Sequence, residues 1–285
     1  MGIVFGLMAA VLLGASDVAA AKVSRTESSM AVTRTALLTS VGVALVGLLI
    51  VPSVWTVRDV AVGSLSGLAM TVGLVMLYRA YALARVGVVA PTTSVLTALI
   101  PVLVAYLRGD VPTGVAWAGI VLGLAGIAMA TYEPPNTALK SGAASQGPGR
   151  TGLALGLGAG LCFGSGFSLL AETSNRSGLV PVVAQRGVGL MLLLLVALPQ
   201  SAPVFALRAH VRKVSLSVGI LAGIAICFLK LGFRRGPDGP VAVATSQFAT
   251  AAVVFAVVFM KERLRPIAGV GIVCAAIGVA MMSLG

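Results

Sequence analysis

The strongest constraint on this chain is a series of ten apolar runs, each about as long as a helix that crosses a bilayer. With 58% hydrophobic and 10% charged residues, the chain is far more apolar than a soluble domain, which averages about 25% charged residues. The sequence therefore predicts an all-α integral membrane protein with ten transmembrane helices. The runs are 3–21, 35–51, 60–78, 86–107, 113–132, 152–171, 180–199, 214–232, 240–260 and 266–284.

The basic charge balance fits this class. A net charge of +12 would suggest nucleic acid as the partner of a soluble protein. In a membrane protein, Lys and Arg gather at helix ends, where they meet anionic headgroups. We therefore expect the lipid bilayer, and not nucleic acid, to be the partner of these charges. Cys162, Cys227 and Cys274 lie inside apolar runs and form no disulfide framework.

The two halves of the chain resemble each other. A shift of 152 positions superposes small and polar residues in a fixed register, including Thr93 on Thr245, Ser94 on Ser246, Gly119 on Gly271 and Gly126 on Gly278. Self-similarity at a fixed offset is typical of a structural repeat. We expect a first repeat at 1–132, a linker at 133–151 and a second repeat at 152–285. Because each repeat has five helices, the second copy would be inverted in the membrane, as in many transporters.

The residues of both halves resemble the EamA domain of the drug/metabolite transporter superfamily. The shared pattern is a Gly-containing turn, a small-residue helix, an acidic turn and a last helix with two glycines seven positions apart. In the first half it runs from Gly87 through Arg108-Gly109-Asp110 to Gly119 and Gly126. In the second half it runs from Gly239 through Lys261-Glu262-Arg263-Leu264 to Gly271 and Gly278. Leu13-Gly14-Ala15-Ser16-Asp17 and Cys162 to Phe167 resemble the first-helix turn of that family.

Two positions depart from the family pattern. Asp110 stands in place of the usual Glu and lacks the following Arg. Val243 stands where the first half has Pro91, so the sequence does not predict a matching proline kink in the run 240–260.

The resemblance implies a solute carrier of the inner or plasma membrane, often an exporter of metabolites or drugs. It also implies a central site among the first four helices of each repeat, with the fifth helices at the periphery. A carrier of lipid-linked substrates is one alternative, and a membrane-embedded enzyme is another. Because the helices contain no paired carboxylates and the single histidine, His210, lies in a basic loop, we predict neither an enzyme nor a cofactor or metal.

Two acidic residues are candidates for a proton-coupling site. Six of the eight acids sit in or beside loops, which leaves Asp17 and Glu172. An acid inside a membrane is costly and is a functional candidate by default. For Asp17 the alternative is a place at the interface, where it caps a helix or pairs with Lys22 or Arg34. For Glu172, close to its helix end, an interface position is favoured.

Further polar and aromatic residues are candidates for substrate binding. Arg186 lies inside the run 180–199 and could bind an anionic group, although it and its repeat mate Arg34 could also be interface anchors. Tyr78, Tyr81, Phe163 and Phe167 are candidate cavity walls for an aromatic or hydrophobic solute, or belt residues at helix ends. Hydroxyl and amide groups at matching positions could line the cavity, or bond to backbone carbonyls within the bundle. They are Thr93, Ser94, Thr245, Ser246 and Gln247.

Two features leave alternatives open. Glycines at every fourth position from 152 to 164 form a ridge that suits close helix packing, either within the bundle or between the protomers of a homodimer. Most Lys and Arg lie in the connections that follow the odd-numbered helices, which predicts that both termini lie outside the cell. The family resemblance implies instead that both termini lie in the cytoplasm.

Overall fold

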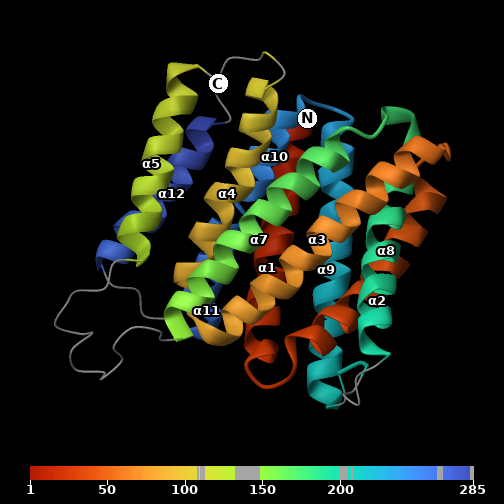
Figure 1. Ribbon diagram of the computed structural model, residues 1–285, viewed down its shortest axis with the longest axis horizontal. Helices are drawn as coiled ribbons and strands as arrows, with labels where there is room; N and C mark the ends of the chain where they lie inside the picture. Colours follow the sequence, from red (N-terminus) through yellow and green to blue (C-terminus); the bar gives the residue numbers. More distant parts are fainter. Residues whose placement is uncertain are drawn as a thin grey trace.

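The computed structural model describes residues 1–107, 109, 113–131, 148–198, 204–206, 208–261 and 266–282, and these residues form helices and connections without a strand. The helices run alternately up and down, so that α1 begins and α12 ends at the same end of the bundle (Figure 1). We call this end the termini end. The first half contains α1 (Gly2–Ser24), α2 (Ser29–Ile50), α3 (Val57–Leu83), α4 (Val86–Leu107) and α5 (Gly114–Thr131). The second half contains α7 (Pro148–Ala171), the 3-10 turn η1 (Asn175–Ser177), α8 (Val180–Ala197), α9 (Ala209–Phe233), α10 (Asp238–Ser246), α11 (Phe248–Met260) and α12 (Pro266–Met282).

The predicted all-α membrane class is confirmed. Eight stretches are long and apolar enough to cross a bilayer, with α10 and α11 together forming one of them. The described apolar parts of α5 and α12 are shorter, at Gly114–Gly126 and Gly269–Met282. The acidic turns of the family pattern, at Asp110 and Glu262, lie outside the described residues, as does the predicted linker up to residue 147.

An interruption occurs in the second half where the sequence has no proline. Helix α4 is continuous although it contains Pro91 and Pro101, whereas α10 ends at Ser246 and α11 begins at Phe248. At the break, the amide of Gln247 donates to the carbonyl of Ala244, a tight 3-10 turn. The hydroxyl of Ser94 on α4 also donates to the carbonyl of Ser246 at 2.6 Å. A neighbouring side chain that enters the backbone ladder is a known cause of a helix kink.

The helices pack in two groups, each of which takes members from both halves. Helix α1 packs on α9, α10 and α11, and α2 packs on α9; we call these five helices the α1 group. Helix α3 packs on α7 and α8, and α4 packs on α7; we call these four helices the α3 group. Helices α5 and α12 pack on each other beside the two groups (Figure 1).

The contacts between α5 and α12 are reciprocal, because a shift of 152 positions converts one contact into the other. A methyl group built on Gly126 of α5 would lie 2.6 Å from the carbonyl oxygen of Gly271 on α12. One built on Gly119 would lie 2.6 Å from the carbonyl oxygen of Gly278. The two helices thus contact each other through corresponding positions. This is typical of an interface around a two-fold axis. Ser94, whose hydroxyl contacts Ser246 directly, lies where such an axis would pass.

The predicted glycine ridge of α7 packs within the bundle. A methyl group on Gly160 would lie 2.6 Å from the carbonyl oxygen of Thr93, and one on Gly164 would lie 2.6 Å from the Cβ of Ile100, so these glycines lie against α4. Gly6 of α1 lies in the same way against Val241 and Thr245 of α10. The ridges therefore allow close approach of helices within one chain.

Candidate functional site

A cavity that is partly open lies between the α1 group and the α3 group. Six helices contribute to its walls, and neither α5 nor α12 is among them. Three of the lining residues, Met70 of α3, Ala222 of α9 and Phe248 of α11, come from the middle of their membrane spans. The lining residues are Leu13, Ser16, Asp17, Met70, Leu74, Tyr78, Phe163, Phe167, Arg186, Ala222 and Phe248.

Opposite charges face this cavity. Asp17 from α1 and Arg186 from α8 are each 4% exposed, and both line the cavity. The hydroxyl of Tyr81 donates to Oδ2 of Asp17 at 3.2 Å. Arg186 makes no hydrogen bond or ion pair with any residue that the structure describes, and its buried Nε has no partner. Because an unpaired guanidinium is costly in such a place, this group is well suited to receive an anion.

Tyr78 provides a second unsatisfied polar atom. Its side chain is fully buried and lines the cavity, and its hydroxyl has no hydrogen-bond partner among the described residues. Its phenol lies within electrostatic range of both Asp17 and Arg186. Buried tyrosine hydroxyls usually find a partner, so a bound solute or water would complete this site.

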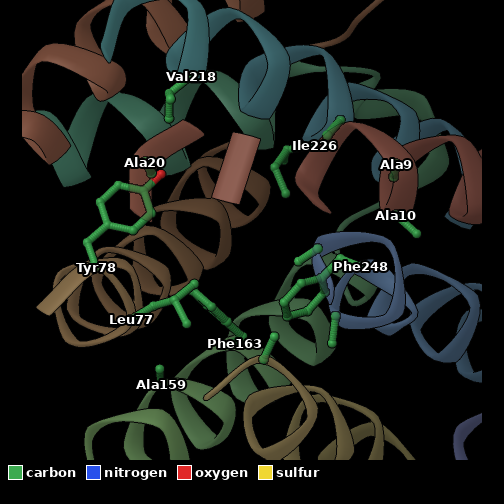
Figure 2. Packing of buried hydrophobic residues seen from close by; sticks show 14 of the residues in the cluster. Ala9, Ala10, Ala20, Leu77, Tyr78, Ala159, Phe163, Val218, Ile226 and Phe248 are labelled. Carbon is green, nitrogen blue, oxygen red and sulfur yellow. The ribbon is translucent and has the colours of Figure 1, made fainter. Parts of the chain in front are cut away.

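The remaining wall is apolar and aromatic. The rings of Phe163 and Phe248 meet edge to face, with centroids 6.3 Å apart. Figure 2 shows these two residues, from α7 and α11, in the same buried cluster as Tyr78 of α3. Phe167 of α7 and Met70 and Leu74 of α3 extend the apolar surface. One side of the cavity can therefore hold a charged group while another holds an apolar one.

Comparison with known proteins agrees with this architecture. Residues 150–284 match the model of the EamA-like transporter family. The match covers the second half of the chain, which is similar to that family. A solved crystal structure matches 99% of this chain and 96% of its own chain with a TM-score of 0.68, but the 18% sequence identity supports a shared fold alone. A comparison with curated proteins gave no significant match.

Five of the predicted site residues meet in the cavity: Asp17, Tyr78, Phe163, Phe167 and Arg186. Tyr81 does not line it but contacts Asp17. Arg34, the repeat mate of Arg186, lies outside the cavity lining, and its guanidinium donates to the carbonyl of Leu193 at 3.4 Å. The half-buried Glu172 follows the last residue of α7 and also lies outside the lining.

The predicted hydroxyl and amide groups on α4, on α10 and at the break between α10 and α11 form hydrogen bonds mainly with backbone carbonyls. Thr93 donates to the carbonyls of Val89 and Gly156, and Ser94 donates to that of Ser246. Thr245 and Ser246 donate to carbonyls of their own helix. The side-chain amide of Gln247 donates to the carbonyl of Ala276 on α12 at 2.9 Å. These contacts fit the packing role that the sequence left open, because the groups are absent from the cavity lining.

Sequence reasoning missed six lining residues: Leu13, Ser16, Met70, Leu74, Ala222 and Phe248. A signal was present for some of them. Met70 and Leu74 precede Tyr78 by eight and four positions and share its helix face. Leu13 and Phe163 match at a shift of 150, at which Gly6 and Gly14 also match Gly156 and Gly164, and Met70 and Ala222 match at the shift of 152. The repeat could therefore have extended the candidate list from one half to the other.

Proposed function

We propose that this protein is a secondary-active carrier that moves a small solute across the membrane by alternating access, with the cavity as its binding site. The observation that carries the proposal is that Asp17 and Arg186 lie in one cavity between two helix groups, nearly excluded from solvent. Ionisable residues inside a membrane bundle usually mark a substrate or ion pathway. Two groups with a site between them can open alternately to the two sides.

The repeat supports this mechanism. We propose that residues 1–132 form a first EamA copy, that 133–151 form the linker and that 152–285 form the second copy. The exchange of partners favours this division: α3 packs on α7 as α9 packs on α1, and α5 pairs with α12. Residues at matching positions, such as Leu13 and Phe163, line the same cavity. A binding site on a two-fold axis between the two halves can present equivalent surroundings to both sides of the membrane.

The cavity chemistry favours a solute with an anionic group and an apolar body. Arg186 can form charge-assisted hydrogen bonds to a carboxylate or phosphate, and its Nε has no other partner among the described residues. Phe163, Phe167 and Phe248 offer apolar surface to the rest of the solute. Asp17, which accepts a hydrogen bond from Tyr81, is the favoured proton carrier of the two acids, because Glu172 lies outside the cavity lining.

We expect cells that express the wild type to accumulate an anionic metabolite in the medium, since the family resemblance favours an exporter. Asp17→Asn should lower this accumulation by about tenfold, corresponding to about 1.4 kcal/mol in the transport cycle. Mass spectrometry of medium and cell extract checks this, at equal membrane levels of each variant. Lys213→Gln is the control, because it removes a single exposed charge near the start of α9 and should export as the wild type does.

The outcome separates the candidate functions. A metabolite that accumulates inside the cell, and not outside, would contradict export. A change confined to lipid-linked compounds would favour the carrier of lipid-linked substrates. Equal export by the wild type and Asp17→Asn would remove Asp17 from the mechanism.

We further propose that the protein lies in the plasma or inner membrane with its termini outside the cell. Nine exposed basic side chains lie at the end of the bundle opposite the termini end, and none of the nine lines the cavity. They are therefore placed to meet anionic headgroups of the cytoplasmic leaflet. These residues are Lys22, Arg25, Arg79, Arg85, Arg150, Arg208, Arg212, Lys213 and Lys261.

Reporter fusions test this orientation. Alkaline phosphatase fused after Gly285 should be active, and a fluorescent protein that folds only in the cytoplasm should stay dark at the same position. The same reporters inserted between α5 and α7 should give the opposite result. A fluorescent fusion at Gly285 together with an inactive phosphatase would instead support the orientation that the family resemblance implies.

A further inference from the structure

A buried polar network joins α3, α7 and α9 at the termini end of the bundle. Its charged members are Lys230, in the last turn of α9, and Asp59, in the first turn of α3, which are 0% and 1% exposed. Neither lines the cavity. Because a buried charge is costly unless it is fully hydrogen-bonded, two such groups in one place call for a specific role.

The ammonium group of Lys230 is fully occupied. Its Nζ donates to the carbonyl of Thr173 at 2.9 Å, to the hydroxyl of Thr173 at 2.6 Å and to the carbonyl of Ser174 at 3.4 Å. Three acceptors match the three donors of an ammonium group. Lys230 therefore ties the end of α9 to the turn that follows α7.

Asp59 holds the same turn from the other side. Its Oδ1 accepts from the backbone amide of Ser174 at 2.9 Å, and its Oδ2 accepts from the hydroxyls of Ser174 and Thr56, each at 2.7 Å. Ser174 is thus fixed to α3 through two donors and to α9 through its carbonyl. The negative charge of Asp59 also lies within electrostatic range of Lys230.

The network crosses between the two helix groups beside the cavity. Helix α7 packs mainly on α3 and α4, whereas α9 packs mainly on α1 and α2, so Lys230 links one group to the other. Along α9, Lys230 lies about 12 Å beyond the cavity residue Ala222, in the direction of the termini end. Helix α7 also runs toward the termini end (Figure 1), and the turn at Thr173 follows its cavity residue Phe167 in the chain.

We propose that Lys230 is a gating residue, whose bonds to the Thr173–Ser174 turn close the cavity toward the termini end. The proposal rests on the alternating access proposed above. When the two groups separate at this end, the three hydrogen bonds of Lys230 break together, and the turn is released from α9. Asp59 stays on the α3 side with Ser174, so it keeps the turn in place for reclosure.

The repeat suggests a second environment for the Lys230 side chain. At a shift of 152, Lys230 corresponds to Tyr78, which lines the cavity in this structure. At the opposite end, the matching link joins the end of α1 to α3, where Arg25 donates to the carbonyl of Tyr81 at 3.4 Å. That link is longer than two of the three bonds of Lys230. In a state where the halves exchange arrangements, Lys230 faces the cavity as Tyr78 does here.

Accessibility of a cavity cysteine tests the gate without any solute. In a background with Cys162, Cys227 and Cys274 replaced by Ala, Ser16→Cys places a thiol in the cavity wall. A membrane-impermeant methanethiosulfonate reagent is applied to oriented vesicles from the termini end. Lys230→Met should raise the labelling rate by about tenfold, because loss of the ammonium hydrogen bonds increases the open population. Thr173→Val, which keeps the charge, should raise it less, and Lys230→Arg should restore slow labelling.

The controls separate gating from misfolding. Lys22→Met removes an exposed lysine from the last turn of α1 and should leave the rate unchanged. Equal labelling of Lys230→Met and wild type from the termini end would overturn the proposal. So would an equal rise from both sides, which indicates general loosening. Because labelling does not depend on transport, this result stands apart from the export experiment, and either proposal can fail alone.

Discussion

Replacing Arg186 by Leu should remove the preference of the cavity for an acid over its amide. Phenylacetate and phenylacetamide share the ring that the phenylalanine wall can hold, and they differ in the group that would meet Arg186. A hydrogen bond to a charged partner contributes about 1.5–3 kcal/mol, so the wild type should bind the acid about 10-fold to 100-fold more tightly. Thermal stabilisation of the purified protein by each compound measures the two affinities.

Two further variants locate this effect. Arg186→Lys keeps the charge but loses the planar donor fork, so it should retain only part of the preference. Arg79→Met removes an exposed arginine next to Tyr78 and should bind both compounds as the wild type does. An Arg186→Leu variant that still prefers the acid would show that another group binds the anion.

The membrane fold was predictable because a bilayer requires long apolar helices, and their composition is visible in any single sequence. The ends of the helices were less so. The run 60–78 corresponds to α3 at Val57–Leu83, which continues past the apolar run through Arg79 and Tyr81. Polar residues inside a helix end the hydropathy signal but not the backbone hydrogen bonds. The break at Gln247 was missed because a side chain of another helix, Ser94, causes part of it.

The candidate site was predictable where burial is costly. Asp17 and Arg186 stand out in sequence because a charge in a membrane span needs a reason. The hydroxyls of Thr93 and Thr245 do not stand out in the sequence, because each can donate a hydrogen bond to a carbonyl of the preceding helical turn. Apolar lining residues such as Ala222 and Phe248 resemble any lipid-facing or packed residue. Only the crossing of the helices decides which of them faces the cavity.

Gly126→Leu and Gly278→Leu should each destabilise the protein by an amount at the upper end of about 1–3 kcal/mol. A Cβ on Gly126 would lie 2.5 Å from the amide nitrogen of Ala275, and one on Gly278 would lie 2.6 Å from the amide nitrogen of Gly123. Backbone atoms cannot turn aside as a side chain can, so α5 and α12 would have to separate. Thermal unfolding in detergent, followed by size-exclusion chromatography, measures the loss.

The matched control lies on the same helix. Gly269 of α12 has nothing within 4 Å of the position of a Cβ, so Gly269→Leu should change stability by no more than about 0.5 kcal/mol. If the two halves are copies of one domain, Gly126→Leu and Gly278→Leu should also lose similar amounts, because they occupy matching positions in a reciprocal contact. A Gly126→Leu variant as stable as Gly269→Leu would contradict the close packing of α5 on α12. Unequal losses at the two positions would leave that packing intact but argue against the symmetry of the pair.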